Sequence, residues 1–208
     1  MQEIILLTCE LLSALIPFLL AFIAYVHTQK TRGAGLKTGT TILVVMLALY
    51  ATAVFHVTGA GTLYDALRYR LSLSPEQINL LPFSREIDPV GYLFNLVLFL
   101  PLGILTPLLR GKRRSLLFTA GAGAAFSMLI ELSQLLNNRS TDIDDLLLNT
   151  MGAIIGFALY RAWDRGRKAR DHGESVSTAV LIISILVPFL GRFLLFNKMR
   201  LARVLYGF

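Results

Sequence analysis

The chain has 208 residues, of which 55% are hydrophobic and only 16% are charged. This composition excludes an ordinary soluble domain and indicates long membrane-crossing segments. The net charge of +7 comes from short basic clusters between apolar runs. Because no motif that recognises a nucleic-acid groove is present, we expect no nucleic-acid partner. The single cysteine, Cys9, excludes an intrachain disulfide and a cysteine-based metal site.

Six apolar segments follow one another along the chain, each close to the ~20 residues that a helix needs to cross a bilayer. They span residues 4–26, 38–60, 91–109, 115–136, 144–161 and 176–196. Because lipid offers no hydrogen bonds to the backbone, the segments predict an all-α polytopic transmembrane bundle, with residues 1–208 as one membrane domain. Pro188 and Gly191 allow the last segment to end early, which would leave five crossing helices.

The connection at 61–90 is the only long one. Leu63, Leu67 and Leu71 are spaced by four residues and predict a short interfacial helix. The apolar stretch 78–83 follows, and it either dips into the bundle or forms a surface connector.

Lysine and arginine set the expected orientation. Twelve of them lie in the first, third and fifth connections, which predicts that these connections are cytoplasmic. The N-terminus and the 137–144 loop are then outside. The basic tail with Lys198, Arg200 and Arg203 disagrees, so either the last segment does not cross or the tail lies on the outer surface as an amphipathic stretch.

Polar residues occur near the outer ends of three consecutive segments. Asn95 lies about one turn into 91–109, Glu131 lies near the end of 115–136, and Asp145 near the start of 144–161. At ~1.5 Å per residue, all of them fall within about 10 Å of the outer surface. Polar side chains are costly in lipid and usually face the bundle interior, so we expect one shared polar layer.

Helical spacing supports this layer. The first face comprises Gly123, Ser127, Glu131 and Gln134, and the second comprises Asp145, Asn149, Gly152 and Gly156. The GxxxG pattern in the second face permits close helix approach. We therefore expect the small residues of 115–136 and 144–161 to pack against one another below the polar layer.

The acids of this layer allow two interpretations, one purely structural and one functional. Acids at a helix start complement the dipole and cap free amides, and a membrane-embedded carboxyl can simply join helices. However, four acids stand beside one arginine, which indicates a bound cation or a ligand with amine or hydroxyl groups. Asp142, Asp144 and Asp145 are candidate ligands for a divalent cation, and otherwise no cofactor is expected. Glu131 and Asp145 are candidate acid–base groups, although no nucleophile–base pair is evident.

Four stretches together resemble the VanZ-like membrane proteins: N-L-L-P-F at 79–83, 95–103, I-E-L-S-Q at 130–134, and 139–156. The resemblance covers about 79–157 and implies a bacterial cell-envelope protein associated with resistance to teicoplanin-type glycopeptides. The implied binding residues are Asn79, Asn95, Glu131, Gln134, Arg139, Asp142, Asp145 and Asn149. The implied structural residues are Pro82, Phe83, Pro101, Gly103, Gly152 and Gly156.

The leading functional expectation is a binding role rather than catalysis. An acidic, amide-lined pocket in the outer leaflet would engage an envelope lipid, a lipid-linked cell-wall precursor or the antibiotic itself. The alternative is a membrane hydrolase or transferase that uses Glu131 as a general acid or base. A transporter is a third class, but the inner halves of these segments carry no polar path. The sequence leaves the ligand and the oligomeric state open.

Overall fold

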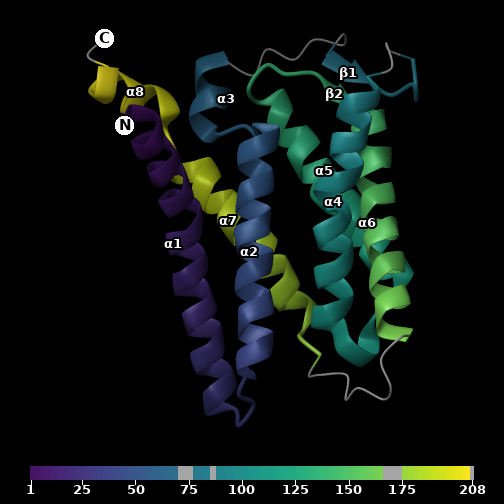
Figure 1. The fold of residues 1–208 in the computed structure, drawn as a ribbon. Helices are drawn as coiled ribbons and strands as arrows, with labels where there is room; N and C mark the ends of the chain where they lie inside the picture. Colours follow the sequence, from purple (N-terminus) through teal and green to yellow (C-terminus); the bar gives the residue numbers. More distant parts are fainter. Residues whose placement is uncertain (70–76, 85–87, 166–174, 207–208) are drawn as a thin grey trace.

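The computed structural model describes residues 1–69, 77–84, 88–165 and 175–206. It contains six apolar helices long enough to cross a membrane (Figure 1). They are α1 (Gln2–Thr31), α2 (Thr38–Thr58), α4 (Pro89–Arg110), α5 (Leu116–Leu135), α6 (Ile143–Arg165) and α7 (Thr178–Leu195). The helix α7 is continuous through Pro188. The six-helix version of the predicted all-α bundle is therefore confirmed, and the protein is a multi-pass membrane protein.

The two ends of the bundle differ in their structure. Both termini lie at one end, together with α3 (Leu63–Tyr69), the strands β1 (Ile78–Asn79) and β2 (Thr141–Asp142), and α8 (Lys198–Tyr206) (Figure 1). We call this the cap end. The opposite end holds the α1–α2 connection and the short helix η2 (Gly111–Arg113), and we call it the basic end. The N-terminus and the 137–144 loop thus share one side, as the charge pattern predicts.

The helices form two groups that lie beside each other in Figure 1. The first group consists of α1, α2 and α7, and the second consists of α4, α5 and α6. Aromatic rings join the groups: Phe126 of α5 lies 5.2 Å from Phe55 of α2 and 5.4 Å from Phe99 of α4, between ring centroids. Phe55 in turn lies 5.3 Å from Phe189 of α7. Buried aromatic pairs of this kind add to the free energy of burial, so they hold the two groups together.

Glycines allow a close approach between α4 and α6. A Cβ atom on Gly152 would lie 2.3 Å from the Leu96 carbonyl oxygen, and one on Gly156 would also meet the α4 backbone. The expectation that this GxxxG pattern packs against α5 is therefore wrong. The pattern permits a close approach but does not specify the neighbour. The α5 contact uses a different face of α6, where Gly123 meets the Ala153 side chain.

The described parts of the connection between α2 and α4 lie at the cap end, where Figure 1 shows α3 and β1. Thr62 and Asp65 cap the start of α3, since each backbone amide donates to the other side chain, at 2.9 and 3.3 Å. The predicted short helix is thus present, although Arg70 and Leu71 lie outside the described residues. Leu80 and Leu81 are 71% and 70% exposed, so the stretch 78–83 does not dip into the bundle. Instead β1 pairs in parallel with β2.

The basic tail forms the amphipathic helix α8 at the cap end (Figure 1). Asn197 begins it, because its side-chain oxygen accepts from the Arg200 amide at 2.9 Å. Arg200, Arg203 and Val204 are exposed. The sequence allowed either a last segment that does not cross or an amphipathic tail. The structure has the second arrangement, in which α7 is long enough to cross and α8 follows it as an amphipathic helix.

Candidate functional site

A polar layer connects the three helices of the second group near the cap end. Asn95 of α4 donates from Nδ2 to Asp145 Oδ1 of α6 at 2.5 Å. One turn further into α6, Asn149 donates from Nδ2 to Ser127 Oγ of α5 at 2.9 Å. The spacing of these residues on their helices places each pair at the same depth.

Glu131 connects α5 to the start of α6. Its side chain is buried in the bundle, with the residue only 8% exposed. Its Oε2 atom accepts from the Thr141 hydroxyl and, at 3.2 Å, from the Asp142 backbone amide. The short loop after α5 brings these donors back over the helix that carries Glu131.

The stretch 78–83 is hydrogen-bonded to Asp142 of β2 and to the first turn of α6. Asn79 donates from Nδ2 to both carboxylate oxygens of Asp142, at 3.1 and 3.2 Å. The Asp144 carboxylate is buried and accepts from the Phe83 backbone amide at 2.9 Å and from the Tyr92 hydroxyl at 2.6 Å. Phe83 has a φ of 53°, in the left-handed region that aromatic residues rarely adopt. The bond to Asp144 therefore helps to hold an unfavourable backbone conformation after Pro82.

Tyr92 is a member of this site that the sequence analysis did not identify. It lies three residues before Asn95 and hence on the same face of α4. Its ring also packs edge-on against Phe83, with centroids 6.2 Å apart. The i, i+3 spacing from an expected binding residue is the signal that would have pointed to it.

Gln134 and Arg139 both bond to the end of α2, although the Arg139 charge also acts on Asp145 of α6. Gln134 Nε2 and Arg139 Nη1 each donate to the Thr58 carbonyl oxygen at 2.8 Å, at the end of α2. Asn137 adds a bond to the Gly59 carbonyl at 2.9 Å. Gln134 and Arg139, which the sequence predicts as binding residues, thus tie the end of α5 and the loop after it to the first helix group, together with Asn137.

The expected structural residues of α4 lie deeper in the bundle. Pro101 is inside α4, and Gly103 meets α6, where a Cβ atom would lie 2.2 Å from the Ala153 carbonyl oxygen. With Gly152 and Gly156 they form the close α4–α6 contact below the polar layer. Their position fixes the distance between the helices that carry Asn95 and Asp145.

The carboxylates of the layer are held by neutral donors. Within the described residues, Glu131, Asp144 and Asp145 take part in no ion pair. In the same part of the chain, the buried Asn149 Oδ1 atom has no hydrogen-bond partner. No group of three or more histidine, cysteine, aspartate or glutamate residues there is arranged to hold a metal ion. Asp142, Asp144 and Asp145 are therefore not arranged as a metal-ligand set, and Asp142 accepts from Asn79 while Asp144 accepts from Phe83 and Tyr92.

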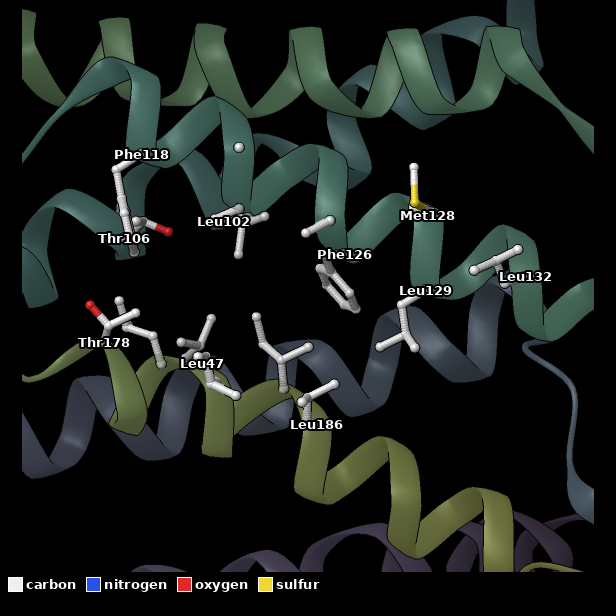
Figure 2. Close-up of a pocket in the computed structure, with 16 residues that line it drawn as sticks. Leu47, Leu102, Thr106, Phe118, Phe126, Met128, Leu129, Leu132, Thr178 and Leu186 are labelled. Carbon is white, nitrogen blue, oxygen red and sulfur yellow. The ribbon is translucent and has the colours of Figure 1, made fainter. Parts of the chain in front are cut away.

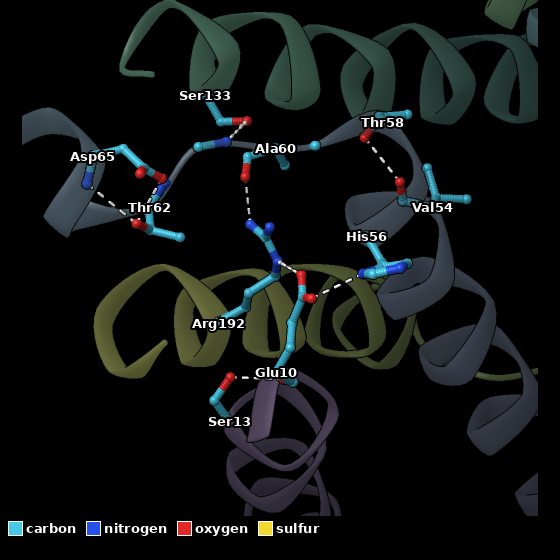
Figure 3. Close-up of polar contacts among 12 residues, drawn as sticks. Glu10, Ser13, Val54, His56, Thr58, Ala60, Thr62, Asp65, Ser133 and Arg192 are labelled. Atoms are coloured by element: carbon cyan, nitrogen blue, oxygen red, sulfur yellow. Dashed lines mark hydrogen bonds and ion pairs between the residues drawn. The ribbon is translucent and has the colours of Figure 1, made fainter. Parts of the chain in front are cut away.

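A second polar cluster lies in the first helix group and was missed by the sequence analysis (Figure 3). Arg192 of α7 donates from Nε to Glu10 Oε1 of α1 at 2.7 Å, and His56 Nδ1 of α2 lies 2.8 Å from Glu10 Oε2. Arg192 also donates to the Ala60 carbonyl oxygen. Because a charge in lipid is costly, an acid in the first apolar run and an arginine in the last each indicate that a partner is needed.

Comparison with known families distinguishes the polar layer from the Glu10–Arg192 ion pair. The VanZ/LLP1 family model matches residues 41–164, which extend from α2 almost to the end of α6. The chain belongs to the VanZ/LLP1 family. No curated protein and no solved structure matches the chain. The VanZ/LLP1 match contains the whole polar layer around Glu131 and Asp145, whereas Glu10 and Arg192 lie outside it.

Proposed function

We propose that this VanZ/LLP1 family protein is a binding protein of the bacterial cell envelope. Its polar layer would bind the amine- or hydroxyl-bearing head of an envelope lipid, a lipid-linked cell-wall precursor or a glycopeptide antibiotic in the outer leaflet. Through this binding it would contribute to teicoplanin-type resistance. The observation that carries the proposal is that Glu131, Asp144 and Asp145 form no ion pair among the described residues, where only the Arg139 charge acts on Asp145 from beyond ion-pair distance.

The chemistry of the layer favours a donor-rich ligand. An unpaired charge taken out of water costs several kcal/mol, so a ligand that supplies a positive charge or hydroxyl donors gains more there than in solution. The unpartnered Asn149 Oδ1 atom accepts one further donor. An ammonium group or a sugar supplies donors of this kind, and the proposal requires no cofactor.

The proposal also places the cap end outside. The support is the asymmetry of charge, since the basic end carries Lys30, Arg32, Lys37 and the cluster at 110–114. An impermeant thiol reagent tests it on intact cells that express Ser140→Cys or Arg113→Cys in a Cys9→Ser background. Labelling of Ser140→Cys alone is expected, and labelling of Arg113→Cys alone would invert the orientation.

Survival in teicoplanin tests the binding role. Cells expressing Glu131→Gln or Asp145→Asn should lose survival at unchanged membrane abundance, because each substitution keeps the shape and removes one acidic group. Glu3→Gln is the matched control, since Glu3 is an exposed acid at the same end. Undiminished survival of both layer variants would overturn the proposal.

A membrane enzyme is the second candidate, and one observation favours it. The Thr141 hydroxyl donates to the Glu131 carboxylate, which is the arrangement of a nucleophile beside a base. Incubation of the purified protein with a lipid-linked precursor, followed by mass spectrometry, separates the two roles. Product that disappears in Thr141→Val and in Glu131→Gln, but persists in Thr141→Ser, would establish catalysis. Binding without product would retain the binding role.

A further inference from the structure

An apolar groove of about 620 Å³ lies between the two helix groups (Figure 2). Residues of α2, α4, α5 and α7 line it, and its volume is within the range of small-molecule sites. Thr106 and Thr178 are its polar lining residues, and both lie at one end beside Phe118 (Figure 2). Met128 and Leu132 lie at the other end. The groove therefore has a polar end and an apolar remainder.

Small residues on α5 create the groove. Gly121, Ala122 and Ala125 line it, and a Cβ atom on Gly121 would meet nothing within 4 Å. The groove opens to the surface of the bundle, since lining residues such as Leu132 and Ile182 are 57% and 49% exposed. In a membrane that surface faces hydrocarbon. An acyl chain fills such a groove, because an empty one would forfeit dispersion contacts and its walls offer water almost no partners.

The length of the groove fits one lipid chain. Phe118 and Leu132 are fourteen residues apart on α5. At ~1.5 Å per residue this is about 21 Å, whereas one leaflet contributes about half of the ~30 Å hydrocarbon core. The groove thus accommodates a full acyl chain from the leaflet at the basic end.

Arg110 supplies a positive charge at the polar end of the groove. Its Nη1 atom donates to Thr178 Oγ1 at 2.8 Å, and its Cζ atom lies 4.1 Å from the centroid of the Phe118 ring. Its Nε atom is buried and has no hydrogen-bond partner in the part of the chain that the structure describes. Lys112 and Arg113 are exposed at the same end. This charge complements an anionic head group.

We propose that the groove binds an anionic phospholipid, with one acyl chain between α5 and α7 and the phosphate at Arg110. The phosphate would lie at the basic end, whereas the polar layer lies near the cap end. The groove reaches Leu132, but its lining does not include Glu131, Asp145 or Asn149. Loss of the proposed function at Glu131 would therefore leave this lipid site intact, and the reverse also holds.

Native mass spectrometry of the delipidated full chain tests the head-group preference. The protein is titrated with phosphatidylglycerol and with phosphatidylcholine that carry the same acyl chains. Phosphatidylglycerol should bind at least about fivefold more tightly, the effect of roughly one basic residue near an anionic lipid. Arg110→Gln should reduce the preference towards one. The matched control, Lys112→Gln, removes a charge at the same end but not beside the groove lining, and should retain the preference.

A second substitution tests the acyl chain. Ala125→Phe fills the groove and should weaken the binding of both lipids by at least about fivefold. The control, Leu159→Phe, adds the same ring to an exposed position of α6 outside the groove and should weaken the binding of neither lipid. The proposal is overturned if Arg110→Gln keeps the preference or if a folded Ala125→Phe variant binds both lipids as the original does. If Ala125→Phe does not fold, the Arg110 and Lys112 variants decide the question.

Discussion

Each helix group buries a glutamate near the cap end, but the two groups treat its charge differently. In the first group, Glu10 forms an ion pair with Arg192 and contacts His56. In the second group, Glu131 accepts from the Thr141 hydroxyl and a backbone amide, and no ion pair neutralises it within the described residues. The Glu10 charge is therefore paired, whereas within the described residues Glu131 is bonded only by neutral donors. The same residue type thus joins helices through an ion pair in one group and, among the described residues, through neutral hydrogen bonds in the other.

The largest expected effect comes from breaking the closed cluster. Arg192→Leu leaves the Glu10 charge buried without its partner and should lower the free energy of unfolding by about 3–5 kcal/mol. Denaturant unfolding in detergent measures this. The double variant Glu10→Leu/Arg192→Leu should recover most of the loss, because a buried pair replaced by apolar residues is often neutral. A double variant as unstable as the single one would show that the pair is not the cause.

A smaller effect is expected from breaking the hydrogen bond between Tyr92 and Asp144 of α6. Tyr92→Phe removes the hydroxyl that donates to the Asp144 carboxylate at 2.6 Å. A hydrogen bond to a charged group contributes about 1.5–3 kcal/mol, and the free energy of unfolding should fall by that amount. The control is Tyr64→Phe, a substitution at a 37% exposed position of α3, which should have almost no effect. Equal stability of the two variants would show that Asp144 does not depend on Tyr92.

The close α4–α6 contact gives a further prediction. Gly156→Ala places a Cβ atom 2.3 Å from the Leu100 carbonyl oxygen, so the helices must separate. We expect a loss of about 1–3 kcal/mol in the free energy of unfolding, measured as above. Because the separation moves Asn95 away from Asp145, survival in teicoplanin should fall as well. Unchanged stability would contradict the packing described for the second group.

The smallest expected effect has the opposite sign. Gly121→Ala adds a methyl group where no atom lies within 4 Å. Alanine favours the helix over glycine by up to about 1 kcal/mol, so thermal unfolding should move to a slightly higher temperature. Destabilisation would show that α5 makes a contact at this position.

Much of the fold follows from local properties of the sequence. Hydropathy identifies the six crossing helices, and depth along each helix explains why Asn95 meets Asp145. Periodicity gives the face of a residue on its own helix but not the neighbour which that face meets. Gln134 shares a face with Glu131, yet it donates to α2, and the GxxxG face of α6 meets α4 instead of α5.

Contacts across the chain are the part that the sequence does not reveal. Glu10 and Arg192 are 182 residues apart, and no local pattern pairs them. The hydrogen bond from the Phe83 amide to Asp144 depends on a backbone conformation that aromatic residues rarely adopt. The sequence could indicate that each charged residue in an apolar run needs a partner, but only the fold supplies its identity.

The comparison between the two glutamates is tested most directly by making the same substitution in both and measuring the free energy of unfolding. Glu10→Gln should lose about 3–5 kcal/mol, because it leaves the Arg192 charge buried without its partner. Glu131→Gln should be at least as stable as the original protein, because it removes a charge that no described residue neutralises. If Glu131→Gln loses as much stability as Glu10→Gln, the Glu131 charge is already compensated within the fold. That result would contradict the account in which this charge is available to a ligand.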